Sequence, residues 1–151
     1  DEHHKVVRLL SDDLQKVATN VHTTRFRYVD VIKKSTGDLL QTSSEIVGEL
    51  PANWQEHLGD LLAAMLPAGS IAGAPKEKSV AVIDEAETYE RGFYTGIAGV
   101  FDGKTLDSFV LIRFIERIGD RFFYKSGAGI TAQSQPLNEY NEIIEKIYIP
   151  I

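Results

Sequence analysis

Residues 94–130 read YTGIAGVFDGKTLDSFVLIRFIERIGDRFFYKSGAGI, and this stretch decides the fold. It holds three runs rich in β-branched and aromatic residues, which predict strands over 94–101, 106–118 and 121–130. The dipeptides Asp102-Gly103 and Gly119-Asp120 separate these runs and are typical of tight turns between antiparallel strands. The stretch therefore predicts an antiparallel meander.

The segments on either side predict a further hairpin and several helices. Helical spacing of apolar residues predicts helices, and β-rich runs around a Ser-Thr-Gly-Asp turn predict a hairpin. The predicted helices cover 2–17, 54–66, 76–89 and 136–149, and the predicted hairpin strands cover 25–32 and 39–49. Helices and strands are segregated along the chain, so we expect an α+β fold with an antiparallel sheet flanked by helices.

Composition excludes several classes of protein. The 151 residues carry a net charge of −6 and no cysteine, which argues against a duplex nucleic-acid binder and rules out thiolate catalysis and cysteine-bound zinc. No apolar run approaches the roughly 20 residues that cross a bilayer, and no signal peptide is recognisable. We expect a cytoplasmic chain that binds neither nucleic acid nor membrane.

Three carboxylates recur at i+3 steps in the last predicted helix, at Glu139, Glu142 and Glu145. Residues three apart share a helix face, so these side chains project from one side. They form either a solvated acidic face or a site for a hard cation such as Mg²⁺, which prefers oxygen ligands. Glu2, on the opening helix, is a candidate for a further ligand.

Arg113 interrupts the most apolar run of the chain, 109–115. A charge inside a strand must be paired or must face a polar cavity, so a carboxylate ligand and a buried acidic partner are both open. Tyr94 is either a core tyrosine or a ligand contact. Gly127 and Gly129 allow either a close approach of backbone to a ligand or a bend in the strand.

The segment 67–76, Pro-Ala-Gly-Ser-Ile-Ala-Gly-Ala-Pro-Lys, resembles the Pro-Ala-Gly-Thr/Ser-x-x-Gly-Ala-Pro-Lys segment of the chorismate-utilising enzymes. Further blocks are similar to that family's in order and spacing, and the match covers nearly the whole chain. These blocks are Glu2-His3 with Asp13-Leu14, Ile83-Asp84-Glu85, Arg91-Gly92-x-Tyr94-x-Gly96, Ile112-Arg113, Gly127-Ala128-Gly129-Ile130, and Glu139-x-x-Glu142 ahead of Lys146.

The resemblance implies a role for each candidate residue. Glu2, Glu139 and Glu142 would hold Mg²⁺ against the ring carboxylate of chorismate. Tyr94 and Arg113 would bind the enolpyruvyl carboxylate, while backbone amides at Gly127 and Gly129 would approach the ligand. Ser70 stands where the family usually has a pocket threonine, and Lys76 would support the pocket rather than perform chemistry.

Within the family, the sequence at residues 25–28 and 89–96 most resembles that of aminodeoxychorismate (para-aminobenzoate) synthase component I. That enzyme aminates chorismate for folate biosynthesis with ammonia from a glutamine amidotransferase partner. The alternatives are anthranilate synthase component I, whose pocket histidine is replaced here by Gln41, and an isochorismate or salicylate synthase. A non-catalytic ligand-binding fragment is the alternative of another class.

The chain resembles only the C-terminal half of the family's α/β-sandwich fold, so residues 1–151 are expected to form a partial chorismate-binding domain. The family's N-terminal half carries the nucleophilic lysine of the aminodeoxychorismate branch, in a Pro-Ile-x-Gly-Thr-like segment, and a Ser-Pro-Glu acid. Neither segment occurs here. We therefore expect no catalytic residue in this chain and an inactive isolated chain.

Overall fold

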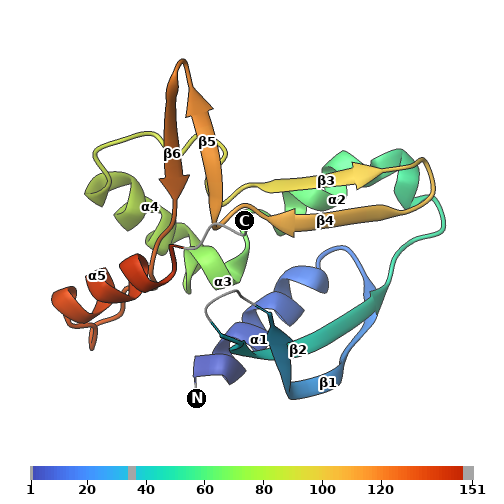
Figure 1. Cartoon of the computed structure of the whole chain (residues 1–151). Coiled ribbons are helices and arrows are strands. Elements are labelled where there is room, and N and C mark those ends of the chain that lie inside the picture. Colours follow the sequence, from blue (N-terminus) through green and yellow to red (C-terminus); the bar gives the residue numbers. More distant parts are fainter. Residues whose placement is uncertain (1, 34–36, 148–151) are drawn as a thin grey trace. The chain divides into compact units, whose positions relative to one another are not determined.

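The computed structural model describes residues 2–33 and 37–147 (Figure 1). The chain divides into two compact units, Asp1–Tyr89 (unit 1) and Glu90–Ile151 (unit 2).

Unit 1 is organised around a helix packed on a long hairpin. Helix α1 (Glu2–Leu14) contacts both strands of the antiparallel pair β1 (Thr19–Ile32) and β2 (Leu39–Glu49). The register runs from Thr19 opposite Glu49 to Ile32 opposite Leu39, with three irregularities on the way. Asn20 and Arg27 both have φ of 51° in these irregular stretches, as in bulges that bend a strand.

The rest of unit 1 is helical. A 3₁₀ turn η1 (Trp54–His57) leads into α2 (Leu58–Met65), and two further helices follow, α3 (Gly69–Ala72) and α4 (Lys76–Ala86). Helix α1 contacts α2 and α3 as well as the hairpin, so it is the element on which the unit is assembled. The buried hydrophobic residues of the described chain, Ala68 and Ala72, lie at α3.

Unit 2 consists of two hairpins and a helix: β3 (Ile97–Phe101) with β4 (Leu106–Val110), β5 (Phe114–Ile118) with β6 (Arg121–Lys125), and α5 (Pro136–Glu145). Asp102 closes the first turn, because its carboxylate accepts hydrogen bonds from the backbone N–H groups of Lys104 and Thr105 at 2.8 and 2.7 Å. Gly119, with φ of 61°, begins the two-residue turn between Ile118 and Arg121. Both turn predictions are confirmed.

The strand expected over 106–118 is wrong as one element, because the chain bends at residues 111–113 and continues as a second hairpin. Leu111 exchanges backbone hydrogen bonds with Thr95 and Gly96, and the N–H of Ile112 turns back to the carbonyl of Val110 at 3.0 Å. A continuous apolar run contains no signal for such a bend, since periodicity cannot separate one long buried strand from two short ones.

The α+β class and the antiparallel pairing are confirmed. In the part of the chain that the structure describes, the strands form three separate two-stranded sheets, so the meander expected over 94–130 is divided into two hairpins. Several predicted boundaries shift: α1 ends at Leu14, β3 begins at Ile97, and β6 ends at Lys125. Helix α3 lies between the predicted helices 54–66 and 76–89, where no helix was expected. The expected turn at 35–36 and the end of the last predicted helix at 148–149 lie outside the described residues.

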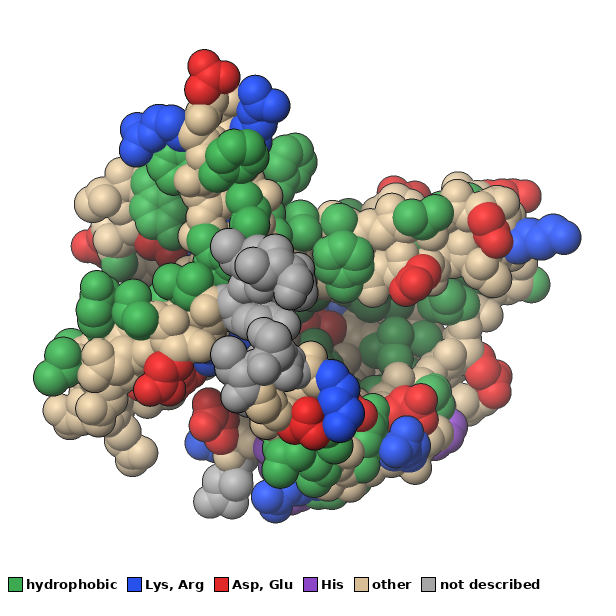
Figure 2. Space-filling model, viewed as in Figure 1, with side chains coloured by type: hydrophobic (Ala, Val, Ile, Leu, Met, Phe, Trp, Pro, Cys, Tyr) green, Lys and Arg blue, Asp and Glu red, His purple; other side chains and the backbone are tan. Residues whose placement is uncertain are grey.

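Large hydrophobic side chains remain exposed over both units, as the space-filling view shows (Figure 2). Val100, Phe93 and Ile130 are exposed over 74%, 73% and 73% of their surface. Among the described residues, no single helix is long and apolar enough to cross a membrane, and one bent pair, Trp54–Ala72 with Lys76–Ala86, meets the length and composition criteria.

Candidate functional site

The candidate residues are divided between the units. Unit 1 carries Glu2, Ser70 and Lys76, and unit 2 carries Tyr94, Arg113, Gly127, Gly129, Glu139 and Glu142. Their local surroundings differ.

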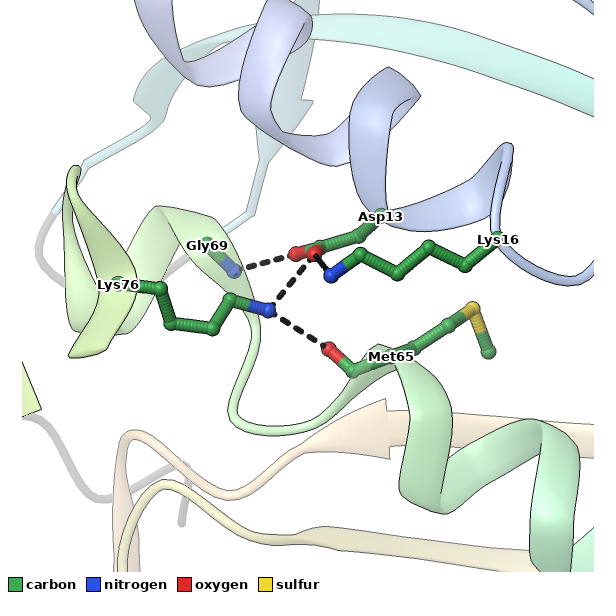
Figure 3. A network of polar contacts seen from close by, with 5 residues as sticks. All are labelled: Asp13, Lys16, Met65, Gly69 and Lys76. Carbon is green, nitrogen blue, oxygen red and sulfur yellow. Dashed lines mark hydrogen bonds and ion pairs between the residues drawn. The ribbon is translucent and has the colours of Figure 1, made fainter.

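In unit 1, Lys76 is bound to a buried carboxylate (Figure 3). Its ammonium donates to Asp13 Oδ1 at 2.7 Å and to the carbonyl oxygen of Met65 at 3.4 Å. Lys16 donates to the same Asp13 oxygen at 2.7 Å, and the backbone N–H of Gly69 donates to Asp13 Oδ2 at 2.6 Å. Lys76, whose side chain is 25% exposed, is therefore held by an ion pair with a buried carboxylate.

These contacts change the acid–base properties of Asp13. Burial raises the pKa of its carboxyl group, but the hydrogen bonds from Lys16, Lys76 and Gly69 outweigh burial and lower the pKa below its ordinary value of 3.8. The hydrogen bond to Asp13 raises the pKa of Lys16 in turn. The Asp13 carboxylate and the Lys16 ammonium are thus charged at neutral pH.

This network was missed by the sequence analysis, which quoted Asp13 only as part of the resemblance. A signal for it was present: Asp13 falls on the same helical face as Val6, Leu10 and Val17. A carboxylate in an apolar stripe needs partners, because burial of a charge is costly unless the charge is paired and hydrogen-bonded. Because those partners lie 56 and 63 residues along the chain, at Gly69 and Lys76, no local pattern identifies them.

Glu2 and Ser70 are exposed. Glu2 lies in the first turn of α1, where the following residue anchors the helix to the hairpin: the Nε2 of His3 is 2.7 Å from the Oγ of Ser44. His3 also makes an edge contact with the ring of Phe26, at 5.7 Å between centroids. The start of α1 is consequently held, although Glu2 itself projects to solvent.

In unit 2 the structure brings Tyr94 and Gly127 together. Tyr94 lies in a tight turn in which Thr95 has φ of 68°, and the Oγ of Thr95 donates to the carbonyl oxygen of Tyr94 at 2.6 Å. The guanidinium of Arg91 lies 5.5 Å from the centre of the Tyr94 ring. A Cβ atom at Gly127 would overlap the Tyr94 hydroxyl, so position 127 accepts no side chain while Tyr94 stays in place.

Arg113 lies at the exposed bend between β4 and β5, which corrects the expectation of a charge inside a strand. Within the described chain Arg113 forms no ion pair, so the buried acidic partner considered above is not found. Gly129 is exposed, with open space where a side chain would stand.

The acidic helix α5 places Glu139 half-buried and Glu142 exposed, one turn apart. Glu142 pairs with the ammonium of Lys146 four residues on. Across residues 2–33 and 37–147 there is no group of three or more His, Asp or Glu side chains arranged to hold a metal ion.

Comparison with known proteins places these residues in context. The chorismate binding enzyme family matches residues 1–151. The chain belongs to the family of chorismate-binding enzymes. The match therefore includes the segments that carry the candidate residues Glu2, Ser70, Tyr94, Arg113, Gly127 and Glu142.

Individual relatives refine this picture. The chain is 53% identical over 150 residues to an uncharacterized PabA-like protein of Haemophilus influenzae, covering 99% of this chain and 46% of that protein. It is 36% identical over 146 residues to anthranilate synthase component 1 of Archaeoglobus fulgidus, covering 97% of this chain and 34% of the relative. It is 32% identical over 148 residues to aminodeoxychorismate synthase component 1 of Bacillus subtilis, covering 97% of this chain and 31% of the relative. The chain thus spans less than half the length of these relatives.

Proposed function

We propose that this chain is the C-terminal, chorismate-binding part of an aminodeoxychorismate synthase component I. The full-length enzyme would replace the 4-hydroxyl of chorismate with an amino group, using Mg²⁺ and ammonia from a glutamine amidotransferase. The observation that carries the proposal is the family match over residues 1–151. The likeness to the Bacillus subtilis enzyme supports the branch.

The proposed substrate is a dicarboxylate, and unit 2 offers groups suited to one of its carboxylates. Arg113 presents an exposed guanidinium, which pairs with carboxylates in a bidentate manner. Tyr94 and Gly127 pack against one another, which supports a shared role in holding the enolpyruvyl carboxylate. Gly129 has space beside its backbone for a ligand. Ser70, in unit 1, is exposed and is a proposed chorismate contact by its resemblance to the family's pocket threonine.

The candidate metal ligands are of the chemical type that Mg²⁺ prefers, because Glu2, Glu139 and Glu142 supply carboxylate oxygens. Glu139 and Glu142 lie one turn apart on α5, while Glu2 comes from unit 1. When bound, Mg²⁺ would supply Lewis acidity toward the ring carboxylate and the leaving hydroxyl. Glu142 would have to leave the ammonium of Lys146 to serve as a ligand.

Product analysis with the full-length protein tests the proposal. Chorismate, Mg²⁺ and an ammonium salt should give a product that keeps the enolpyruvyl group and releases no pyruvate. Omission of ammonia should abolish product formation. Release of pyruvate with formation of fluorescent anthranilate would contradict the assignment, and so would an ammonia-independent hydroxyl isomer of chorismate.

Anthranilate synthase component I is the second candidate, because the Archaeoglobus fulgidus relative is more similar to this chain than the Bacillus subtilis one, at 36% against 32% identity. Gln41, which replaces the histidine of anthranilate synthases, favours the first candidate. Gln41 is exposed and pairs with Asp30 across the hairpin. The pyruvate measurement separates the two.

A non-catalytic binding role of the 151-residue chain is tested with the same substrates. We expect the isolated chain to be inactive, since the nucleophilic lysine and the acid are proposed to lie in the rest of the full-length protein. Turnover by residues 1–151 alone would show that the catalytic groups are within them.

A further inference from the structure

Asp13 is the one charged residue that the structure buries among residues 2–33 and 37–147, with 6% of its surface exposed. A carboxylate at such a position is costly unless hydrogen-bond donors and opposite charges surround it. Asp13 meets this condition with three donors, on Lys16, Gly69 and Lys76. Both of its oxygens are used.

Two of these donors bracket a short segment of unit 1. Gly69 is the first residue of α3 and Lys76 is the first residue of α4, so Asp13 is tied to both ends of residues 69–76 (Figure 3). Lys76 also reaches the last residue of α2, through the carbonyl oxygen of Met65. One carboxylate therefore joins α1 to the three helices that follow the hairpin.

Helix α3 cannot determine its own position. It has four residues and no side-chain cap, and a helix of one turn is unstable without tertiary contacts. Gly69 is pressed against α1, because an added Cβ would lie 3.0 Å from Asp13 Oδ2 and 3.1 Å from the Cβ of Leu9. The position of α3 is thus set by its contact with α1, and Asp13 supplies the polar part of that contact.

Ser70 follows Gly69 directly and is exposed. A hydroxyl that must meet a ligand needs a defined backbone position, and here the preceding N–H is fixed by Asp13. We propose that Asp13 is a positioning residue for the substrate, which holds residues 69–76 so that Ser70 is presented to chorismate. This inference rests on the proposed function, because Ser70 is a proposed chorismate contact.

A purely structural role for Asp13 would have a different signature. Loss of a stabilising ion pair lowers the free energy of unfolding without changing the affinity of the molecules that remain folded. Loss of positioning raises the KM for chorismate and leaves kcat nearly unchanged, because a pocket contact that binds substrate and transition state equally affects KM alone.

The test uses the full-length enzyme with two variants of the same network. Asp13→Asn weakens the contacts to Gly69 and Lys76. Lys16→Met removes an ammonium from the same oxygen of Asp13, but Lys16 makes no bond to residues 69–76. We expect Asp13→Asn to raise the KM for chorismate roughly tenfold with kcat within about twofold, and Lys16→Met to leave KM within about twofold.

Amide hydrogen exchange without substrate provides the second measurement. The N–H groups of Gly69 to Gly73 should exchange faster in Asp13→Asn than in wild type, and at the wild-type rate in Lys16→Met. Unchanged exchange in Asp13→Asn would overturn the positioning role. A KM for chorismate in Asp13→Asn equal to that of an active wild-type enzyme would also overturn it. The same holds if Lys16→Met raises the KM as much as Asp13→Asn does.

The two measurements separate this inference from the proposed function. If the wild-type enzyme does not bind chorismate in calorimetry, the proposed substrate is wrong and Ser70 has another ligand or none. If residues 69–73 then exchange faster in Asp13→Asn but not in Lys16→Met, the result still supports the control of this segment by Asp13. If their exchange is unchanged in Asp13→Asn, that control is refuted.

Discussion

The hydroxyl of Tyr94 lies directly against the Cα of Gly127, so that even a methyl group at position 127 would overlap it. The two residues come from the turn before β3 and from the segment after β6. Tyr94 and Gly127 are 33 residues apart in the sequence and pack directly against each other. The position of the tyrosine ring therefore depends on the absence of a side chain at residue 127.

Gly127→Ala should displace the Tyr94 hydroxyl and lower kcat/KM for chorismate roughly 10- to 100-fold, since small displacements of a binding group are costly. In a Tyr94→Phe background the same substitution should cost much less, because the nearest remaining ring atom of residue 94 lies 3.3 Å from the new Cβ. Steady-state kinetics on the four proteins measure this coupling. Gly59→Ala, which meets nothing within 4 Å, is the control. Equal costs in both backgrounds would contradict the packing relationship.

Arg113→Lys should raise the KM for chorismate roughly tenfold, because lysine keeps the charge and loses the planar fork that grips a carboxylate. Arg113 is exposed, so the free energy of unfolding should change by less than about 0.5 kcal/mol. Urea unfolding and kinetics check the two statements. Arg117→Lys, at another exposed arginine that pairs with Asp120, should leave KM unchanged. A KM equal to that of wild type in Arg113→Lys would remove Arg113 from the site.

The stability of the protein should depend on pH through Asp13. The pKa of Asp13 is lowered in the folded state, so its contribution to stability is present above the ordinary value of 3.8 and is lost as the pH falls through the folded-state pKa. At pH 7, Asp13→Asn should lower the free energy of unfolding by about 2–3 kcal/mol. This is less than the roughly 3–5 kcal/mol for a fully buried pair, because both lysines are partly exposed. The difference between variant and wild type should shrink at pH 3.

Urea unfolding of wild type and Asp13→Asn at pH 7, 5 and 3 measures this dependence. Asp120→Asn, at a fully exposed aspartate, serves as the control and should show little difference at any of these pH values. A difference for Asp13→Asn that is constant from pH 7 to pH 3 would argue against the ionised network.

Glu142→Gln in the full-length protein should abolish the dependence of chorismate binding on Mg²⁺. The amide cannot supply the negative charge that Mg²⁺ requires, although it keeps the shape of the side chain. Calorimetry with chorismate, with and without Mg²⁺, measures the effect. Glu145→Gln, three residues along the same helix, is the matched control and should behave as wild type. Mg²⁺-dependent binding that survives in Glu142→Gln would refute the ligand assignment.

Local sequence patterns were sufficient for the secondary structure wherever the determining interactions are local. The turn at Gly119-Asp120 and the Asp102 turn are confirmed because their hydrogen bonds and backbone angles involve neighbouring residues. The bend at residues 111–113 escaped prediction because it depends on backbone bonds from Leu111 to Thr95 and Gly96, which no apolar pattern encodes.

The sequence by itself determined the family, the acidic composition, and the residue types available for binding a dianion and a metal ion. Only the tertiary structure decided which charge is buried. Sequence reasoning expected Arg113 to lie inside a strand, either paired with a buried acidic residue or facing a polar cavity. Arg113 lies at an exposed bend, and the buried charge is Asp13. The reason is physical: burial of a charge is permitted by its partners. The partners of Asp13 at Gly69 and Lys76 reach it only when α3 packs against α1 and the first residue of α4 comes within reach of Asp13.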